Sequence, residues 1–366
     1  MALIFLALAV GVGRAMALAI REPILRFTDN GTFQIAVFSD LHYGEDIEHP
    51  QLVVINGDLI TGENTYKHNS SDYVDRIVAP LVNRSLLWAS TYGNHDSEFN
   101  LSRQEIFARE KRYPNSLTQS MVPMHSYSSG VSNYYLPVYS ANKSDMTPKA
   151  ILWFFDSRGG NEFQTVDEDG KVVAINNYVD SSVVNWFTTA RDKLNDLHNT
   201  TIPSLAFFHI PVTAMLAFQQ GPGVNPHKEP GINDDDPLDE QGPSDGSFNY
   251  KGQDKPFMKA LVETKGLMAT FSGHDHGDDW CFKWNKTLPE MDIKGDGVVL
   301  CFDRHSGYGG YGTWTRGSRQ ILLDERTLGS QTETWVRLEQ GNISGAVVLN
   351  STYGEDYYPV VLDTHT

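Results

Sequence analysis

The chain has 366 residues, and 40% of them are hydrophobic, which is enough to bury a substantial core and excludes a wholly disordered protein. Lys and Arg number 29 against 46 Asp and Glu, a formal net charge of −17, with no basic run or stripe. This balance argues against a nucleic-acid partner, because phosphate backbones are bound by clustered Lys and Arg.

The first 19 residues, MALIFLALAVGVGRAMALA, predict a secretory signal peptide. An apolar stretch from Ala2 to Val12 is followed by Ala17-Leu18-Ala19, the small-x-small form of a cleavage site. Arg14 interrupts the apolar stretch, so a disordered or membrane-anchoring N-terminus is the alternative. We expect a signal peptide over residues 1–19 and a single domain over residues 20–366.

Nine Asn-x-Ser/Thr glycosylation acceptors support secretion, because such sites are used at the surface of secreted proteins. They begin at Asn30, Asn69, Asn83, Asn100, Asn142, Asn199, Asn285, Asn342 and Asn350. We expect a glycoprotein of the secretory pathway, extracellular or vacuolar, with no stable membrane insertion.

Five short apolar runs end in polar residues of unusual type. The runs are 33–38, 52–55, 86–92, 205–208 and 267–271, followed in turn by Ser-Asp-Leu-His, Asn-Gly-Asp, Gly-Asn-His-Asp, a single His, and Ser-Gly-His-Asp-His. Central strands of α/β sheets read as continuous apolar runs, and ligands bind beyond their carboxyl ends. The pattern therefore predicts five strands that end at one edge.

Helices are predicted between these runs. Residues 72–82 carry apolar side chains at helical spacing, with Pro80 near the end. Ser102 and Glu105 have the form of a capping box that opens a helix to about Lys111. Asp180 precedes an apolar stripe that reaches Leu194.

The second half predicts a loop and then more strands. Residues 221–254 are rich in Gly, Pro, Asp and Asn and predict a long loop beside the site; their spacing does not match a calcium loop. The β-like runs after Trp280 are expected to complete a second sheet without a domain boundary. Cys281 and Cys301 lie in two of these runs and form either a disulfide or two buried thiols.

The residues at the strand ends offer only oxygen and imidazole nitrogen to a metal. They are Asp40, His42, Asp58, Asn94, His209, His274 and His276. A lone His such as His209 is more often a core residue, but its place in this series favours a ligand. The mixture suits divalent Mn, Fe or Zn, and seven groups exceed the needs of one ion. Two ions that share a carboxylate would clamp the attacking and leaving oxygens of a phosphoester hydrolysis.

In order, D-x-H, G-D, G-N-H-D, a lone His and G-H-x-H resemble the calcineurin-like metallophosphoesterase superfamily. The wider text NGDLITGEN, SGHDHGDDWCFKW and RHSGYGGYGTWTRGSRQI resembles its fungal and plant branch related to purple acid phosphatases. The resemblance covers nearly the whole chain after the signal segment. It implies an α/β fold in which two mixed β-sheets pack as a sandwich with flanking helices.

The resemblance also implies a role for each motif residue. Asp40, His42 and His276 would hold a first ion, Asp58 would bridge, and Asn94, His209 and His274 would hold a second. His95 would face the substrate, as proton donor to the leaving oxygen or as a positive partner for phosphate, with Asp96 able to orient it.

Three parts of the sequence lie outside this pattern. Purple acid phosphatases carry a tyrosine three residues after the bridging Asp, where this chain has Thr61, and a Gly where it has His42; we therefore expect a divalent pair rather than a purple ferric site. Four other histidines are expected in surface or loop positions: His49, His68, His227 and His305. The glycines of 307–312 are expected to form a β-turn region.

The connection between the first two motifs is short. Residues 43–51, YGEDIEHPQ, number nine, whereas a parallel crossover needs about a dozen or more. The first crossover helix is therefore missing. The strands can still pair, but we expect Ile35, Val37, Val53 or Ile55 to lose apolar cover. Either the crossover is simply short in a working enzyme, or a segment has been lost and the product is unstable or inactive.

The sequence thus predicts a dinuclear-metal phosphomonoesterase in which metal-bound hydroxide attacks phosphorus in line. Its substrate would be a phosphorylated small molecule or a phosphoprotein. One alternative is a phosphodiesterase that acts on nucleotides or lipid head groups. Another is a catalytically impaired relative that acts by binding.

Overall fold

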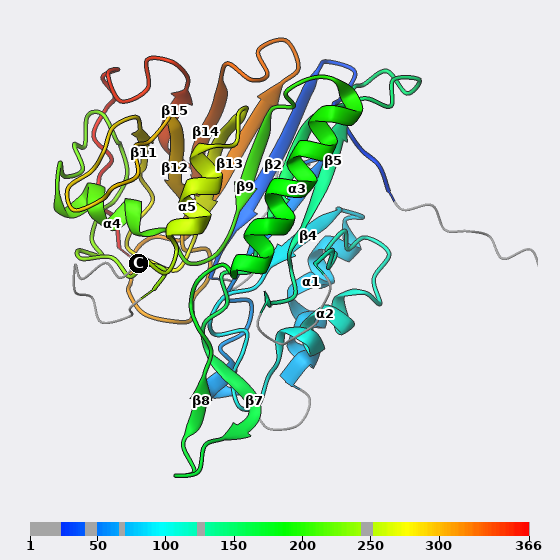
Figure 1. Cartoon of the computed structure of the whole chain (residues 1–366), viewed down its shortest axis with the longest axis vertical. Coiled ribbons are helices and arrows are strands. Elements are labelled where there is room, and N and C mark those ends of the chain that lie inside the picture. Colours follow the sequence, from blue (N-terminus) through cyan, green and yellow to red (C-terminus); the bar gives the residue numbers. More distant parts are fainter. Residues whose placement is uncertain (1–22, 41–49, 66–69, 123–128, 243–251, 366) are drawn as a thin grey trace, which may run out of the picture.

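The computed structural model describes residues 23–40, 50–65, 70–122, 129–242 and 252–365, and two mixed β-sheets dominate this part of the chain (Figure 1). The first sheet, in spatial order, comprises β1 (Leu25–Arg26), β5 (Tyr134–Tyr139), β6 (Pro148–Phe154), β9 (Ser204–Phe207), β10 (Leu267–Ser272), β12 (Val298–Phe302) and β11 (Cys281–Trp284). The second comprises β15 (Ile343–Leu349), β14 (Thr332–Leu338), β13 (Gly317–Asp324), β2 (Thr32–Phe38), β3 (Leu52–Asn56) and β4 (Trp88–Thr91).

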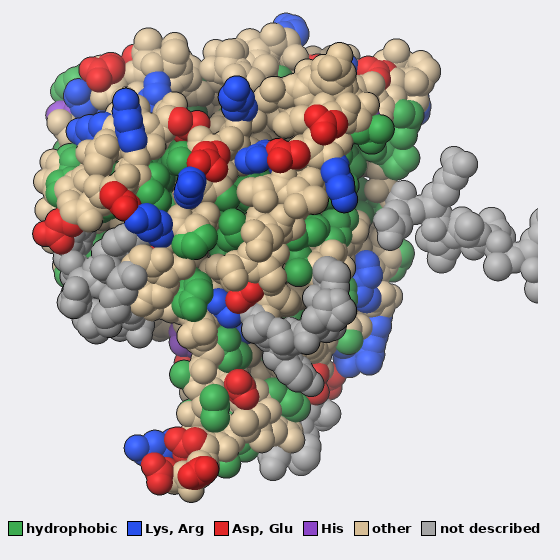
Figure 2. Space-filling view, in the orientation of Figure 1, with side chains coloured by type: hydrophobic (Ala, Val, Ile, Leu, Met, Phe, Trp, Pro, Cys, Tyr) green, Lys and Arg blue, Asp and Glu red, His purple; other side chains and the backbone are tan. Residues whose placement is uncertain are grey.

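Five α-helices are described, with two short 3₁₀ turns (Gly62–Asn64 and Ser70–Asp72). The helices are α1 (Tyr73–Asn83), α2 (Arg103–Glu110), α3 (Ser181–His198), α4 (Thr213–Gln220) and α5 (Lys255–Val262). A separate hairpin of β7 (Asn161–Val166) and β8 (Val172–Ala174) projects from the body, with acidic and basic side chains at its tip (Figure 2). None of the described helices is long and apolar enough to cross a membrane.

The two sheets pack face to face, as the resemblance implies. Alternate residues of β2, such as Ile35, lie in one buried cluster with Phe207 of β9 and Phe271 of β10, from the opposite sheet. The outer face of the first sheet is covered by α3 and α5, which bury Phe187 and Phe257 against it. The fold is therefore a sandwich with flanking helices.

The predicted helices are present. Ser102 caps α2, and its side chain accepts a hydrogen bond from the Glu105 N–H. Asp180 caps α3 in the same way through the Ser182 N–H. Pro80 lies inside α1, near its end. Capping side chains satisfy amide groups that a first helical turn leaves without partners, which explains where α2 and α3 begin.

β2 and β3 pair in parallel despite the short connection, with Ile35 opposite Leu52. The expected loss of apolar cover is wrong, because all four residues named for it are at most 1% exposed: Ile35, Val37, Val53 and Ile55. The first two face the opposite sheet. The other two pack with Val74 and Val78 of α1, so α1 covers this part of β3.

Two further expectations need correction. The strands after Trp280 do not complete one sheet: β11 and β12 join the first sheet, whereas β13, β14 and β15 join the second. Similarly, the motif strands β2, β3 and β4 belong to the second sheet, and β9 and β10 to the first. The motifs therefore meet where two sheets end together, rather than along one edge.

Some of the remaining expectations concern described residues, and others concern residues outside the described part of the chain. Cys281 and Cys301 are directly paired across β11 and β12 and form a disulfide. Residues 221–242 contain no described helix or strand, as expected for a long loop. The predicted signal peptide, His42, His49 and His68 lie outside the described residues.

Candidate metal centre

Asn56, at the end of β3, ties the two sheets together. Its side-chain amide donates to the carbonyl oxygens of Phe208 and Phe271, at 3.3 and 3.1 Å, and to Asp303 Oδ2 at 2.6 Å. The main-chain carbonyl oxygen of Asn56 lies 2.9 Å from Nδ1 of His209. One buried side chain thus brings the ends of β3, β9 and β10 to a common locus, where the polar residues that follow these strands converge.

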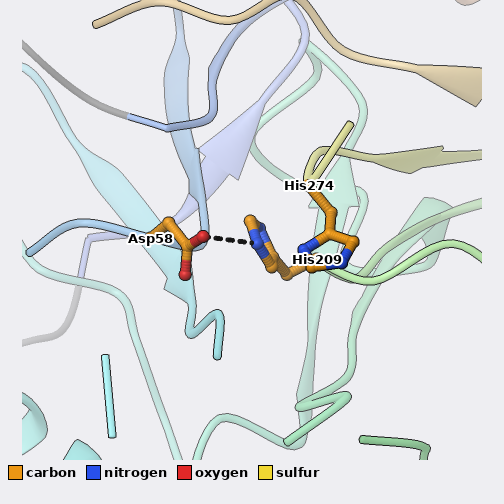
Figure 3. A group of neighbouring side chains, drawn as sticks. All are labelled: Asp58, His209 and His274. Atoms are coloured by element: carbon orange, nitrogen blue, oxygen red, sulfur yellow. Dashed lines mark ion pairs between the residues drawn. The ribbon is translucent and has the colours of Figure 1, made fainter. Parts of the chain in front are cut away.

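Asp58, His209 and His274 form the centre of this locus (Figure 3). Each offers a ligand atom within 4.8 Å of the other two. Asp58 Oδ2 lies 3.0 Å from His209 Nε2, and the two imidazole ring centroids are 5.3 Å apart. Two atoms that bind the same ion at about 2.1 Å each are separated by a distance similar to the one between Asp58 Oδ2 and His209 Nε2. Asp58 and His274 also have φ of 48° and 81°, a costly conformation of the kind that clusters at functional sites.

Asp40 and His276 lie next to this group. Asp40 Oδ1 is 3.5 Å from His276 Nε2 and 4.0 Å from His209 Nε2. Asp40 follows β2 with a φ of 55° and is 5% exposed. It therefore stands between an imidazole that follows β9 and one that follows β10.

The donor atoms fit divalent ions. Asp40 Oδ1 and Asn94 Oδ1 are buried without a hydrogen-bond partner among the described residues, and a bound cation would satisfy such oxygens. Nδ1 of His209 faces the Asn56 carbonyl, and Nδ1 of His276 faces the Tyr311 carbonyl at 3.0 Å. These partners assign the proton to Nδ1, which leaves Nε2 of each ring as a lone-pair donor toward the site.

The electrostatics of the centre favour positive charge. Burial raises the pKa of Asp58, but neighbouring His209 outweighs this and lowers it to about 2. Burial likewise raises the pKa of Asp40, and His276 and His209 leave it below its ordinary value. For His209, burial lowers the pKa, but Asp58 and Asp40 raise it to about 10. The two carboxylates therefore stay ionised and attract positive charge, so a divalent cation would compete with the proton for the Nε2 lone pair of His209.

His95 lies at the rim of the centre, with its side chain 42% exposed. The main-chain N–H of His95 donates to Asp58 Oδ1 at 2.9 Å. Its Nδ1 lies 2.9 Å from the carboxylate of Glu63. Burial lowers the pKa of His95, but Asp58 and Glu63 raise it above its ordinary value. His95 is thus a partly exposed imidazole held next to the ligands.

Asp96 does not have the position expected of a residue that orients His95. It is fully buried, and its carboxylate accepts hydrogen bonds from the N–H groups of Ile60 and Gly93, at 3.0 and 2.8 Å. Asp96 therefore braces two loops, and the described carboxylate that contacts the His95 ring is Glu63. Burial, with Asp58 adding to it, raises the pKa of Asp96 to about 7.

His305 was expected in a surface or loop position; it lies in the connection between β12 and β13, but it is not at the surface. His305 is 2% exposed, and its ring centroid lies 3.8 Å from that of His276. Arg316 Nη1 donates to His305 Nδ1 at 2.8 Å. His227 is a half-buried loop residue that stacks on Tyr357. Glu63 and His305 were missed although both lie inside segments that carry the resemblance, because a motif does not reveal its spatial neighbours.

The comparisons agree with this geometry. The sequence model of the calcineurin-like phosphoesterase family matches residues 33–278. The chain belongs to this family. That match runs from β2 to just beyond His276, so it includes every residue assigned above to a metal.

Two relatives of this calcineurin-like phosphoesterase carry functional names. An Arabidopsis thaliana protein named "Probable inactive purple acid phosphatase 29" is 25% identical over 87% of this chain and 86% of its own length. "Phosphatase DCR2" of Saccharomyces cerevisiae is 28% identical over 72% of this chain. The match covers 47% of the length of that protein, about half. Among solved structures, a dimetal phosphatase from Danio rerio aligns with a TM-score of 0.51 at 14% identity, covering 87% of this chain and 98% of that one; this likeness concerns the fold.

Proposed function

We propose that this protein is a dinuclear-metal phosphomonoesterase. The observation that carries the proposal is the cluster of Asp58, His209 and His274, which offers ligand atoms within 4.8 Å of one another, with Asp40 and His276 directly beside it. Asp58 would bridge the two ions. Asn94, His209 and His274 would complete the site on one side, and Asp40, His42 and His276 on the other.

The bound ions would supply positive charge that activates water and neutralises the phosphoryl oxygens. Oxygen and imidazole ligands suit Mn, Fe or Zn, and the chain offers no thiolate here. The two cysteines of the sequence form a disulfide.

His95 would donate a proton to the leaving oxygen. Its exposure of 42% allows contact with a bound ester, and its main-chain bond to Asp58 keeps the ring close to the ligands. Glu63 favours the protonated imidazole and fixes the ring by the bond at Nδ1. With Nδ1 engaged, Nε2 is the atom from which the proton would be transferred.

The partners would be phosphorylated small molecules or phosphoproteins, and the location would be the secretory pathway. The disulfide supports an oxidising compartment. The candidate sequon residues Asn142, Asn199 and Asn285 lie outside the strands and helices of the fold, where glycans are tolerated.

A second function is favoured by one observation, the word "inactive" in the name of the Arabidopsis relative. In that case the protein would bind metal and a phosphate group without turnover. The partly exposed His95 weighs against this role, because a protein that only binds metal and a phosphate group has no need of a proton donor beside the ligands.

The test is hydrolysis of a chromogenic phosphate monoester by the purified, monodisperse protein, stripped of metal and then supplied with Mn²⁺ or Zn²⁺. We expect turnover that returns only with metal and that exceeds hydrolysis of the matching bis-ester. The Asp58→Asn variant is the inactive control. Faster bis-ester hydrolysis would make the protein a phosphodiesterase, and two bound ions without any hydrolysis would support the binding role.

A further inference from the structure

His276 differs from the other candidate ligands because both faces of its ring are covered by other rings. Tyr311 stacks on it with ring centroids 4.1 Å apart and an interplanar angle of 9°. His305 lies at 3.8 Å with a tilt of 34°. Both neighbours come from the Gly-rich segment 305–312, in which the glycines of 307–312 were expected to form a β-turn region.

Tyr311 also holds His276 by hydrogen bonds. Its carbonyl lies 3.0 Å from His276 Nδ1, and its hydroxyl accepts the His276 N–H at 3.1 Å. The same hydroxyl donates to Asp235 Oδ2 at 2.7 Å, and Asp235 in turn accepts the Gly277 N–H. One tyrosine therefore fixes the ring plane, the tautomer and the backbone of His276.

His305 has a different role from His276, although the two rings touch. A guanidinium can only donate, so the Arg316 bond makes His305 Nδ1 an acceptor and places the ring proton on Nε2. A neutral imidazole of this tautomer has no free lone pair for a metal. His305 is therefore suited to support His276 rather than to replace it as a ligand.

The glycines of the segment allow this close approach. Gly310 has a φ of 69°, and a Cβ at this position would lie 2.4 Å from His276 Cε1. Any side chain there would push the segment away from the ring. Gly312 has a φ of 80°, and a Cβ at this position would lie 1.9 Å from Cζ3 of the Trp314 ring.

We infer that Tyr311 and His305 form a clamp that positions the His276 ring for metal binding. The inference rests on the proposed dinuclear site and deepens it: the segment 305–312 sets the affinity of the ion on the Asp40 side. Residues that hold a metal ligand in this way typically change metal affinity by about 10- to 100-fold when removed. Tyr311 is then a positioning residue, because it acts through His276.

The experiment compares Tyr311→Ala, Tyr311→Phe and Tyr357→Ala with the parent. Tyr357 is the matched control, an exposed tyrosine that stacks on His227 with ring centroids 4.3 Å apart, outside the candidate centre. Bound Zn²⁺ is counted by mass spectrometry after gel filtration, and affinities are measured by competition with a chromogenic chelator. Tyr311 is half exposed, so its truncation leaves the core intact, which circular dichroism verifies.

We expect Tyr311→Ala to retain one tightly bound ion and to hold the other about 10- to 100-fold more weakly. Tyr311→Phe keeps the stacked ring and should restore most of this affinity, whereas Tyr357→Ala should match the parent. Two ions bound with parental affinity in Tyr311→Ala, or an equal loss in Tyr357→Ala, would overturn the clamp. A parent that binds two ions without turnover would end the proposed function, and the clamp would still stand on the metal measurements.

Discussion

At the scale of single residues, the proposed centre contains residues that would hold metal and a residue, His95, that would move a proton. Asp58 illustrates the first kind, since Oδ2 lies by His209 Nε2 and Oδ1 accepts the His95 N–H. A carboxylate that occupies both positions cannot be replaced by an amide without loss of charge. The two kinds of residue should therefore respond differently to substitution.

We predict that Asp58→Asn removes bound metal and most activity while the fold persists. The amide keeps the shape of the side chain, but the charge that would bridge two ions is lost. We expect kcat to fall by about 10²-fold or more, the scale seen when a principal electrostatic group is removed. Bound metal is counted in parallel with kcat, and a variant that retains both ions would show that Asp58 is not the bridge.

His95→Ala should keep both ions and lose turnover. The loss expected for a proton donor is about 10²- to 10⁴-fold in kcat. Glu63→Gln should have a smaller effect in the same direction, because it weakens the bond at Nδ1 but leaves the imidazole. His198→Ala, at the end of α3, is the control for loss of an imidazole elsewhere. A His95→Ala protein as fast as the parent would refute the assignment.

At the scale of elements, α2 ends in a buried carboxylate. Glu110 is fully buried, and burial raises its pKa to about 6 in spite of the hydrogen bond that it accepts from Ser116 Oγ at 3.4 Å. Its ordinary value is 4.5. The folded protein therefore binds this proton more tightly than the unfolded chain does. The contribution of Glu110 to stability falls as pH rises from about 4.5 through 6 and is constant above.

Glu110→Gln should remove this dependence. The free energy of unfolding of the variant, relative to that of the parent, should increase across that pH window. At pH 7 the variant should be more stable by up to about 2 kcal/mol. Urea unfolding at a series of pH values measures the difference. Glu105→Gln, an exposed carboxylate of the same helix, is the matched control. Parallel curves for Glu110→Gln and the parent would contradict the prediction.

The disulfide joins two neighbouring strands of the first sheet, β11 and β12. Cys281 and Cys301 close a loop with a sequence separation of 20, so the bond restricts the unfolded chain more than the folded one. We expect the Cys281→Ser/Cys301→Ser double variant to lose on the order of 3 kcal/mol of unfolding free energy. The parent in reducing buffer should show the same loss. Alkylation of both thiols in unreduced protein would show that no bond forms.

At the scale of the whole molecule, the strands and their motifs were predictable, whereas their arrangement was not. Continuous apolar runs identified β2, β3, β9 and β10, because strands buried on both faces have that composition. Nothing in the runs indicates that β2 pairs with β13, where Ala36 lies opposite Gln320 from the other end of the chain. Sheet membership follows from such long-range pairing.

The same limit explains the centre. Its candidate ligands were predicted from the order of motifs, since the residues that follow strand ends meet wherever the strands do. His305 and Glu63 were missed, because His305 stacks on His276 and Glu63 bonds to His95, and each partner lies far from it in sequence. The resemblance implied that Asp96 orients His95, but its carboxylate accepts hydrogen bonds from the main-chain N–H groups of Ile60 and Gly93.

The short connection between β2 and β3 gives the last prediction. A lost segment would leave apolar surface uncovered, yet Val53 and Ile55 are buried against α1, and Ile35 and Val37 against the opposite sheet. A helix of about 20 residues inserted between Glu45 and Pro50 therefore finds none of these side chains left to cover. We expect the melting temperature of the insertion variant to equal that of the parent or to fall. A rise of several degrees would show that the chain lacks a stabilising segment, because at this size each kcal/mol corresponds to about 2 °C or slightly less.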